Sequence, residues 1–320
     1  MSEKTVFITR KIPSSALDIL KKNGIKILQH KGSEPIERVE LLKRTKNADA
    51  VISLLTEKID EEFIDNLIDC RIIANYAVGY NNIDVEYARQ KGIEVTNTPG
   101  ILTDATADLT MALLLACTRR IVESDTYLRE GKFTSWQPEL LLGMELKGKT
   151  LGIIGAGRIG KAVVKRAAGF GLKILYFSNS KSLEIEEKYN AGKVSLNKLL
   201  KISDIISVHV PLTDKTYHLL NSENLTKIKK GAVIINTARG EIIDEKSLIK
   251  LLKSKHLFSA GLDVFENEPN VNKKFMNLKN VVLLPHIGSA TVEARTKMAE
   301  CCAENVVSVL KGKKAITPIP

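Results

Sequence analysis

A glycine-rich motif near the middle of the chain is the feature that most restricts its fold. The motif, Gly155-Ala156-Gly157-Arg158-Ile159-Gly160, directly follows the apolar run 151–154. Between a strand and a helix, G-x-G-x-x-G lets the backbone approach a pyrophosphate, which the helix N-terminus attracts. Outside that context, the same spacing also occurs in ordinary tight turns. The sequence therefore predicts a dinucleotide-binding βαβ unit in which Gly155, Gly157 and Gly160 contact the cofactor.

Short apolar runs alternate with amphipathic stretches along most of the chain. The first series comprises 6–9, 25–28, 50–55 and 72–76, and the second comprises 151–154, 173–176, 205–208, 233–236, 260–262 and 281–284. Such alternation predicts parallel sheets with helical crossovers, and the second series is typical of a six-strand doubly wound unit. The expected fold class is α/β, with two doubly wound parallel-sheet (Rossmann/flavodoxin-like) domains and a cleft between them.

The length of 320 residues also favours about two domains. The longest apolar run, 109–117, is about half the length that a membrane-spanning helix needs. Charged residues flank a short apolar stretch at the N-terminus, which is unlike a signal peptide. We expect a cytoplasmic protein without membrane contact.

Neither the cysteines nor the net charge indicates a further binding partner. Cys70, Cys117, Cys301 and Cys302 form no CxxC pair and have no histidine at metal-ligand spacing, so no metal site is expected. The net charge is +11, but the lysines and arginines are scattered in short clusters without interleaved aromatic residues. This pattern favours solvated faces over a nucleic-acid-binding surface.

The segment that follows the second strand of the predicted dinucleotide unit lacks an expected carboxylate. An Asp or Glu about twenty residues after the glycine motif would bind the ribose 2′-hydroxyl of NAD. The chain instead has Ser178-Asn179-Ser180-Lys181-Ser182. Hydroxyls, an amide and one cation favour a 2′-phosphate, so we expect NADP(H) to be preferred, with NAD(H) possible as well.

Three polar residues follow strands of the second series, at the edge where open α/β sheets bind ligands. Arg239 suits a substrate carboxylate, and Glu268 could orient the imidazole of His286, which exchanges protons near neutral pH. Taken singly, they are also explained as a surface cation, a turn residue before proline and a structural histidine. Together they predict a catalytic group. The other histidines, His30, His209, His218 and His256, have no comparable sequence surroundings.

At these segments the chain resembles the D-isomer-specific 2-hydroxyacid dehydrogenases. Those enzymes use an Arg, a Glu and a His in this order, in segments similar to 237–240, 261–269 and 284–290. The resemblance extends over nearly the whole chain. Within the family, the segments 75–84, 133–136 and 285–291 are most similar to glyoxylate/hydroxypyruvate reductases.

The resemblance implies a set of binding residues. The backbone amides of Val78 and Gly79 would hold the substrate carboxylate with Arg239, and Ser289 would reach the substrate. Cofactor positions would be Gly157, Arg158 and Ile159 at the pyrophosphate, Pro211 beside the adenosine, and Thr237, Asp263 and Gly288 around the nicotinamide, with Thr106 nearby. Asn179, Ser180, Lys181 and Ser182 would face the ribose 2′ position.

The family architecture implies a substrate-binding domain of residues 1–99 and 290–320 and a dinucleotide-binding domain of residues 100–289. The helices near 103–121 and 290–310 would be crossovers. The implied activity is NAD(P)H-dependent reduction of a small 2-oxo acid, glyoxylate or hydroxypyruvate, to the D-2-hydroxy acid. His286 would be the acid/base, Glu268 its partner and Arg239 the carboxylate ligand.

Two alternatives remain open at this point, namely a 3-phosphoglycerate dehydrogenase without its regulatory domain and a dinucleotide-sensing binding protein similar to co-repressors. The apolar helix near 103–121 and the segment that continues to Trp136 also predict a homodimer. In similar reductases, this Trp reaches the partner's active site.

Overall fold

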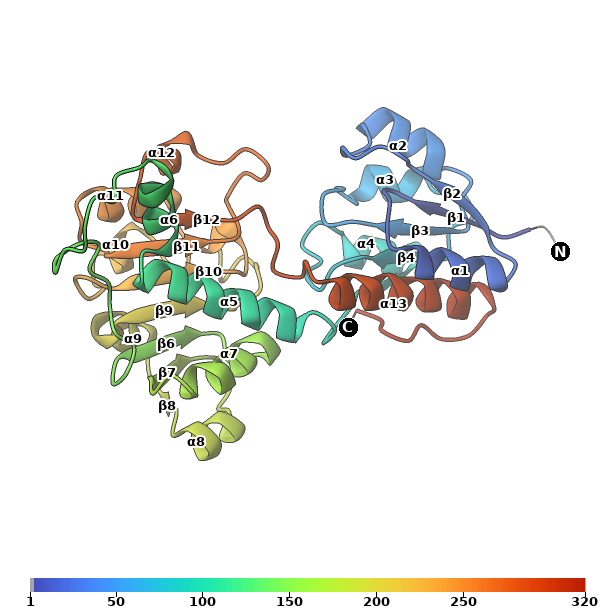
Figure 1. The fold of residues 1–320 in the computed structure, drawn as a ribbon. Coiled ribbons are helices and arrows are strands. Elements are labelled where there is room, and N and C mark those ends of the chain that lie inside the picture. The colour runs from blue at the N-terminus through green and yellow to red at the C-terminus, as the bar shows by residue number, and fades with distance from the viewer. Residues whose placement is uncertain (1–2, 320) are drawn as a thin grey trace. The chain divides into compact units, whose positions relative to one another are not determined.

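The computed structural model describes residues 3–319, which divide into two units. Among the described residues, unit 1 comprises 3–102 with 289–319, and unit 2 is Thr103–Gly288. Each unit contains one sheet whose strand pairs are all parallel, with helices packed on the sheet (Figure 1). The expected α/β class with two doubly wound parallel sheets is therefore confirmed.

Unit 1 has a five-stranded sheet in the order β2-β1-β3-β4-β5. Its strands are β1 (Thr5–Ile8), β2 (Lys26–Gln29), β3 (Ala50–Ser53), β4 (Ile72–Asn75) and β5 (Glu94–Thr96). Its helices are α1 (Ser14–Lys22), α2 (Arg38–Thr45), α3 (Glu61–Asn66), α4 (Val85–Gln90) and α13 (Val292–Leu310).

Alternate residues of the central strands of unit 1 fill two separate cores. Ile8 and Ile52 pack in one cluster with Met298 and Val306 of α13, whereas Phe7 and its strand-face neighbours pack with residues of α2, α3 and α4. This two-sided burial explains the continuous Val/Ile-rich runs, because strands of a parallel sheet are covered on both faces. Helix α13, although last in the sequence, thereby belongs to the core of unit 1.

Unit 2 has a seven-stranded sheet in the order β12-β11-β10-β9-β6-β7-β8. Its strands are β6 (Thr150–Ile154), β7 (Lys173–Phe177), β8 (Gly192–Lys193), β9 (Ile205–Val208), β10 (Val233–Asn236), β11 (Ser259–Leu262) and β12 (Val281–Leu283). Its helices are α5 (Thr103–Thr118), α6 (Ile121–Arg129), α7 (Arg158–Ala168), α8 (Leu183–Tyr189), α9 (Leu196–Ile202), α10 (Ser222–Leu225), α11 (Glu245–Lys253) and α12 (Lys273–Met276), with a 3₁₀ turn at Gly240–Ile242.

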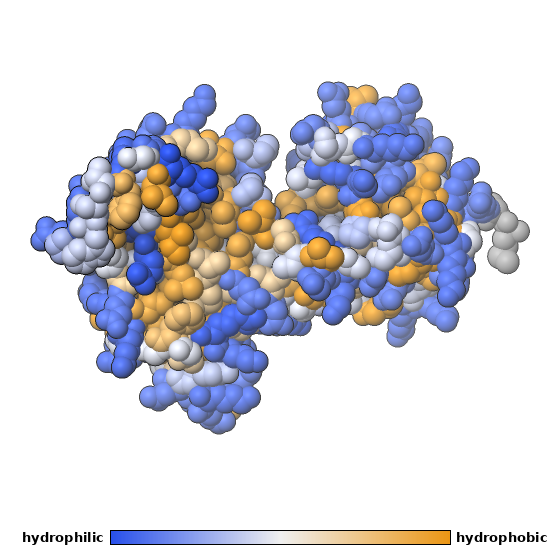
Figure 2. Space-filling model, in the orientation of Figure 1, coloured by the Kyte–Doolittle hydropathy of each residue, from blue (hydrophilic) through white to orange (hydrophobic). Residues whose placement is uncertain are grey.

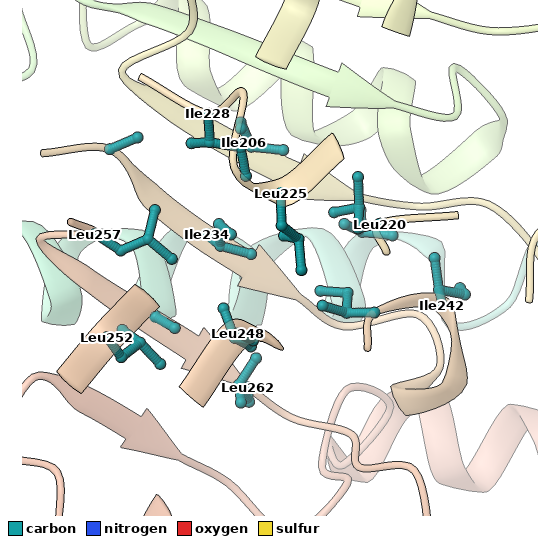
Figure 3. Close-up of a cluster of buried hydrophobic side chains, with 14 of the residues drawn as sticks. Ile206, Leu220, Leu225, Ile228, Ile234, Ile242, Leu248, Leu252, Leu257 and Leu262 are labelled. Atoms are coloured by element: carbon teal, nitrogen blue, oxygen red, sulfur yellow. The ribbon is translucent and has the colours of Figure 1, made fainter. Parts of the chain in front are cut away.

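The central strands of unit 2 are likewise buried on both faces. Ile234 of β10 lies in one cluster with Leu248 and Leu252 of α11 (Figure 3), whereas the neighbouring Ile235 lies in a second cluster with residues of α5 and α7. Burying each such leucine stabilises the fold by about 1.5–3 kcal/mol. The sheet is thus fixed from both sides, and its strand ends become firm attachment points for loops.

Two short strands were missed by the sequence prediction. The first sheet has a fifth strand, β5, and the second a seventh, β8. β5 has three residues and β8 has only two, Gly192 and Lys193, so neither contains enough apolar residues to produce an alternating pattern. The prediction of a six-strand unit was therefore wrong by one edge strand.

The segment 119–145 of unit 2 contains no buried residue. It includes α6, and its side chains Phe133 and Trp136 are 53% and 80% exposed. In the orientation of Figure 1, hydrophobic residues also gather on the face of unit 2 where α5 lies (Figure 2). Unit 2 alone therefore leaves a substantial apolar surface uncovered.

None of the helices within residues 3–319 is both long enough and apolar enough to span a membrane.

Candidate active site

The glycine motif forms the turn between β6 and α7, as its sequence predicts. Gly155 has φ +100°, and a Cβ there would lie 2.7 Å from the carbonyl carbon of His209, just beyond β9. Gly160 sits so close to the carbonyl of Gly155 that a Cβ would overlap it. At Gly157, by contrast, a Cβ would meet nothing within 4 Å.

These three glycines therefore do different things. Gly155 and Gly160 allow close packing between the turn, the helix and β9, whereas Gly157 is exposed and leaves room for a ligand. β6 and β9 are neighbours at which the strand order reverses, which is where doubly wound sheets bind ligands. The turn fits the pyrophosphate of a dinucleotide at the N-terminus of α7, where Arg158 and Ile159 form the first helical residues.

The three polar residues predicted as catalytic follow three neighbouring strands. In the register of the sheet, Asn236 of β10 pairs with Leu262 of β11, and Leu262 pairs with Leu283 of β12. The three strands therefore end side by side. The loops that begin there carry Arg239, Glu268 and His286.

Glu268 and His286 are brought into direct contact. The His286 Nδ1 lies 2.7 Å from Glu268 Oε2, and the Phe265 N–H donates to Glu268 Oε1 over 3.0 Å. Burial favours the neutral carboxyl, but the hydrogen bond to His286 and the charges of His286 and Arg239 hold the pKa of Glu268 below its usual range. Glu268 is thus an ionised partner that fixes one ring nitrogen of His286.

Arg239 is positioned by the end of β10. Asn236 donates from Nδ2 to the Arg239 carbonyl over 2.8 Å and accepts from the Ala238 N–H over 3.0 Å. Burial lowers the pKa of Arg239, although a guanidinium remains charged near neutrality. Its charge acts on Glu268, so the site combines one cation with a carboxylate–imidazole pair.

Gly240 lets the Arg239 loop approach the loop that follows β11. A Cβ at Gly240 would overlap the backbone of Phe265 and Glu266. Since Phe265 donates to Glu268, this approach sets the spacing between Arg239 and Glu268. Asn236 and Gly240 were not among the predicted site residues, although a polar residue at a strand end and a glycine after an arginine were visible signals.

Asp263 holds the segment that carries His286. It is fully buried, and its two carboxylate oxygens accept from the N–H groups of Ile287 and Gly288, each over 2.7 Å. Burial raises the pKa of Asp263 despite these two bonds. His286 itself has φ +53°, an unusual conformation for a non-glycine residue, and its N–H donates to the Asp263 carbonyl.

Hydroxyl groups of α5 link the helix to the same strand ends. Thr106 donates from Oγ1 to the Gly288 carbonyl over 3.1 Å, and the Thr110 and Thr237 hydroxyls lie 2.9 Å apart. Thr106, Thr237, Asp263 and Gly288, which the family resemblance implied for the nicotinamide end, are therefore joined by short contacts. Thr110 was not predicted.

The residues expected near the ribose 2′ position form the loop between β7 and α8. Asn179, Ser180 and Lys181 are exposed, whereas Ser182 is buried and its N–H donates to the Tyr176 hydroxyl over 2.9 Å. Pro211 lies in the exposed loop after β9, with its carbonyl bonded to Thr216. The bond from the Ser182 N–H to the buried Tyr176 thus attaches the β7–α8 loop to the interior of unit 2.

The predicted substrate residues Val78, Gly79 and Ser289 belong to unit 1. Val78 and Gly79 follow β4, and their carbonyls accept from the side-chain amides of Asn97 and Asn75 over 2.8 and 3.0 Å. These bonds turn both carbonyls toward unit 1 side chains. The Ser289 carbonyl accepts from the Thr291 N–H over 2.9 Å.

The other histidines also have polar partners. His218 Nε2 lies 2.9 Å from Glu266 Oε1, a carboxylate neighbour that its sequence surroundings did not indicate. His209 Nε2 lies 2.8 Å from the Ser207 hydroxyl, and desolvation of its imidazole lowers its pKa to about 3. In the described part of the chain, no group of three or more His, Cys, Asp or Glu side chains could hold a metal ion.

Comparison with known proteins gives consistent matches. Residues 111–288 match the family model described as D-isomer specific 2-hydroxyacid dehydrogenase, NAD binding domain. The glyoxylate reductase of Thermococcus litoralis is 51% identical over 312 residues, which cover 96% of this chain and 94% of that protein. The glyoxylate reductase of Korarchaeum cryptofilum is 46% identical over 310 residues, covering 96% and 93%.

Solved structures match over the same length. The TT0316 protein of Thermus thermophilus superposes with a TM-score of 0.93 at 44% identity, covering 99% of this chain and 100% of that one. An NADPH-dependent glyoxylate/hydroxypyruvate reductase from Sinorhizobium meliloti, in complex with NADP and malonate, has a TM-score of 0.87 at 30% identity, covering 99% and 97%.

The different surroundings of the glycines give a first test. We expect Gly157→Ala to leave the Tm within about 2 °C of the wild type, because its methyl group meets open space, but to weaken dinucleotide binding at least tenfold. Gly160→Ala should instead lower the Tm by several degrees, because its methyl group overlaps the Gly155 carbonyl. Circular dichroism melts and calorimetric titrations with NADH and NADPH measure both. Unchanged dinucleotide affinity in Gly157→Ala would exclude this turn as the pyrophosphate site.

Proposed function

This chain belongs to the D-isomer-specific 2-hydroxyacid dehydrogenase family, and we propose that within it the protein reduces glyoxylate and hydroxypyruvate to the corresponding 2-hydroxy acids. Membership makes it an NAD(P)-dependent oxidoreductase that acts on 2-oxo acids. The observation that carries the choice of substrate is the 46–51% identity to glyoxylate reductases over nearly the whole chain.

In the proposed reaction, Arg239, His286 and Glu268 each have a different role. Arg239 binds the substrate carboxylate, since a guanidinium donates two parallel hydrogen bonds to such a group. His286 donates a proton from Nε2 to the developing alkoxide, because its Nδ1 is engaged by Glu268 at 2.7 Å. The ionised Glu268 keeps the imidazole oriented through its contact with Nδ1.

The turn at Gly155–Gly160 would hold the dinucleotide pyrophosphate. The strand ends at Thr237, Asp263 and Gly288, together with Thr106, would surround its other end. When bound, the reduced nicotinamide supplies the hydride that reaches the keto carbon. From the family resemblance we also propose that Val78, Gly79 and Ser289 contact the substrate.

Removing the acid or the carboxylate ligand should affect kinetics differently. We expect His286→Ala to lower kcat by about 10²-fold or more, as loss of a general acid does. Arg239→Ala should lower kcat and raise KM together, because the carboxylate contact serves both binding and orientation. Steady-state kinetics with glyoxylate and hydroxypyruvate measure both effects.

His30→Ala in unit 1 is the matched histidine control and should behave as the wild type. Full activity of His286→Ala or Arg239→Ala would contradict the mechanism. Including pyruvate and 3-phosphohydroxypyruvate in the assay tests the substrate choice. A clear preference for the phosphorylated acid would replace the proposed function with 3-phosphoglycerate dehydrogenase activity.

We also propose that NADP(H) is preferred and NAD(H) is accepted. Support comes from the β7–α8 loop, which has no Asp or Glu directly after β7 and has the exposed Asn179, Ser180 and Lys181 there instead. A carboxylate there would repel a 2′-phosphate and accept ribose hydroxyl bonds, so its absence removes both effects.

Asn179→Asp restores that carboxylate. We expect the ratio of kcat/KM for NADPH to that for NADH to fall at least fivefold, because the new charge repels the 2′-phosphate. Asn190→Asp, an exposed position after α8, makes the same charge change as a control. A wild-type enzyme that already favours NADH tenfold, about 1.4 kcal/mol, would refute the preference.

A homodimer is proposed from the uncovered segment 119–145. Every residue of α6 is at least partly exposed, and Trp136 is 80% exposed, so a second copy would bury apolar surface that unit 2 leaves in water. By resemblance to similar reductases, Trp136 would then lie near the partner's active site.

Charges on this surface should dissociate the dimer. We expect sedimentation velocity to show a dimer for the wild type at micromolar concentration and a monomer for Ile121→Asp/Val122→Asp, because two buried carboxylates would oppose association. Glu139→Gln serves as an exposed control in the same segment. A monomeric wild type whose activity does not change on dilution would overturn the proposal.

A further inference from the structure

A carboxylate does reach the end of β7, but it comes from α8 and not from the strand itself. The buried Tyr176 hydroxyl donates to Glu186 Oε1 over 2.6 Å and accepts from the Ser182 N–H over 2.9 Å. One tyrosine thereby fixes both the start of α8 and the position of Glu186. The hydrogen bond from Tyr176 also helps to lower the pKa of Glu186, so the carboxylate is charged near neutrality.

Glu186 uses its other oxygen to bind Lys181. The Lys181 Nζ lies 3.1 Å from Glu186 Oε2, and the carboxylate side chain is only 19% exposed. The sequence predicted Lys181 as the cation that faces a 2′-phosphate. In the structure its ammonium group is paired with Glu186 of α8, which offsets its charge.

Lys193 adds a second cation to the same place. It lies on β8, which pairs with β7 so that Lys193 is opposite Tyr176, and its Nζ donates to the Asn179 carbonyl over 3.0 Å. The side chain is exposed, and in the described part of the chain no carboxylate lies within ion-pair distance of it. With Lys181, Glu186 and Lys193 counted together, the strand end carries one net positive charge.

We propose that Lys193 provides the positive charge that meets the 2′-phosphate of NADP(H), and that Glu186 moderates the preference by holding Lys181. This inference rests on the proposed cofactor preference and assigns it to two residues outside the β7–α8 loop. Phe177, the last residue of β7, lies twenty positions after Gly157, where dinucleotide-binding units recognise the ribose 2′ group.

This arrangement explains why the expected preference for NADPH over NADH is limited. A single exposed lysine is a mobile, solvent-screened point charge, unlike the planar fork of an arginine. Its effect should therefore be a few-fold and should fall as salt rises, because exposed charges are screened over about 10 Å at 0.1 M ionic strength. NADH, which lacks the 2′-phosphate, should barely respond to changes at Lys193 or Glu186.

Calorimetric titration of the full-length protein with NADPH and with NADH, in the absence of substrate, tests the proposal. Lys193→Gln should weaken NADPH binding three- to tenfold at low salt while NADH binding changes less than twofold. Lys188→Gln, an exposed lysine of α8, makes the same charge change and should leave the ratio of the two dissociation constants unchanged. Raising the salt to 0.5 M should remove most of the Lys193 effect.

Glu186→Gln should strengthen NADPH binding a few-fold, because the amide can still accept from Tyr176 but no longer holds Lys181. Glu187→Gln, the adjacent exposed residue, is its control. In the double variant Lys181→Gln/Glu186→Gln, the gain caused by Glu186→Gln should shrink to less than half, since there is no lysine to release.

The proposal is overturned if Lys193→Gln changes the affinities for NADPH and NADH equally or not at all. The role of Glu186 is overturned if its gain equals that of Glu187→Gln or persists without Lys181. These binding measurements do not need turnover. A protein that binds NADPH as expected but does not reduce glyoxylate would therefore refute the proposed substrate and leave this inference standing.

Discussion

The buried carboxylate of Asp263 is the contact on which the geometry of the proposed catalytic group depends. Removing a carboxylate from water is costly unless donors replace the lost hydration, and here the Ile287 and Gly288 N–H groups do so. The same two bonds fold the segment after β12 back onto the end of β11. They hold His286 in its left-handed conformation, with its ring directed at Glu268. The hydrogen bonds of the buried Asp263 carboxylate thus fix the direction of the His286 ring, the proposed proton donor.

The position of Arg239 relative to Glu268 depends on a steric constraint. Gly240 allows the backbone after β10 to touch the backbone at Phe265 and Glu266, and any side chain there would separate the two loops. Asn236 closes the Arg239 turn with two bonds from its side-chain amide. Because β10, β11 and β12 are held in register by two-sided burial, these local contacts add up to one arrangement. Packing of the sheet therefore also determines where the charged side chains lie.

The sequence predicted the features that are encoded locally. The glycine motif, the apolar strands and the α/β class required only short-range patterns, and the structure and family comparisons confirm the class and the family. The site residues remain predictions, but Arg239, Glu268 and His286 do follow adjacent strands. What the sequence could not show depends on contacts between residues that are separated along the chain. The bond from Lys193 to Asn179 depends on the pairing of β8, a strand of two residues, with β7. The bond from Tyr176 to Glu186 depends on the placement of α8 next to the Tyr176 side chain.

The second histidine–glutamate pair shows why a pair alone does not define an active site. His218 contacts Glu266 at 2.9 Å, but the same Glu266 oxygen accepts from the Glu245 N–H, and Glu245 accepts from the Glu266 N–H. These reciprocal bonds attach the start of α11 to the loop after β11, and burial raises the pKa of Glu245. The charge of Arg239 instead helps to lower the pKa of Glu268, and its guanidinium can bind a carboxylate beside the imidazole. The neighbouring cation, more than the histidine–carboxylate contact, distinguishes the proposed site for a 2-oxo acid from the His218–Glu266 pair.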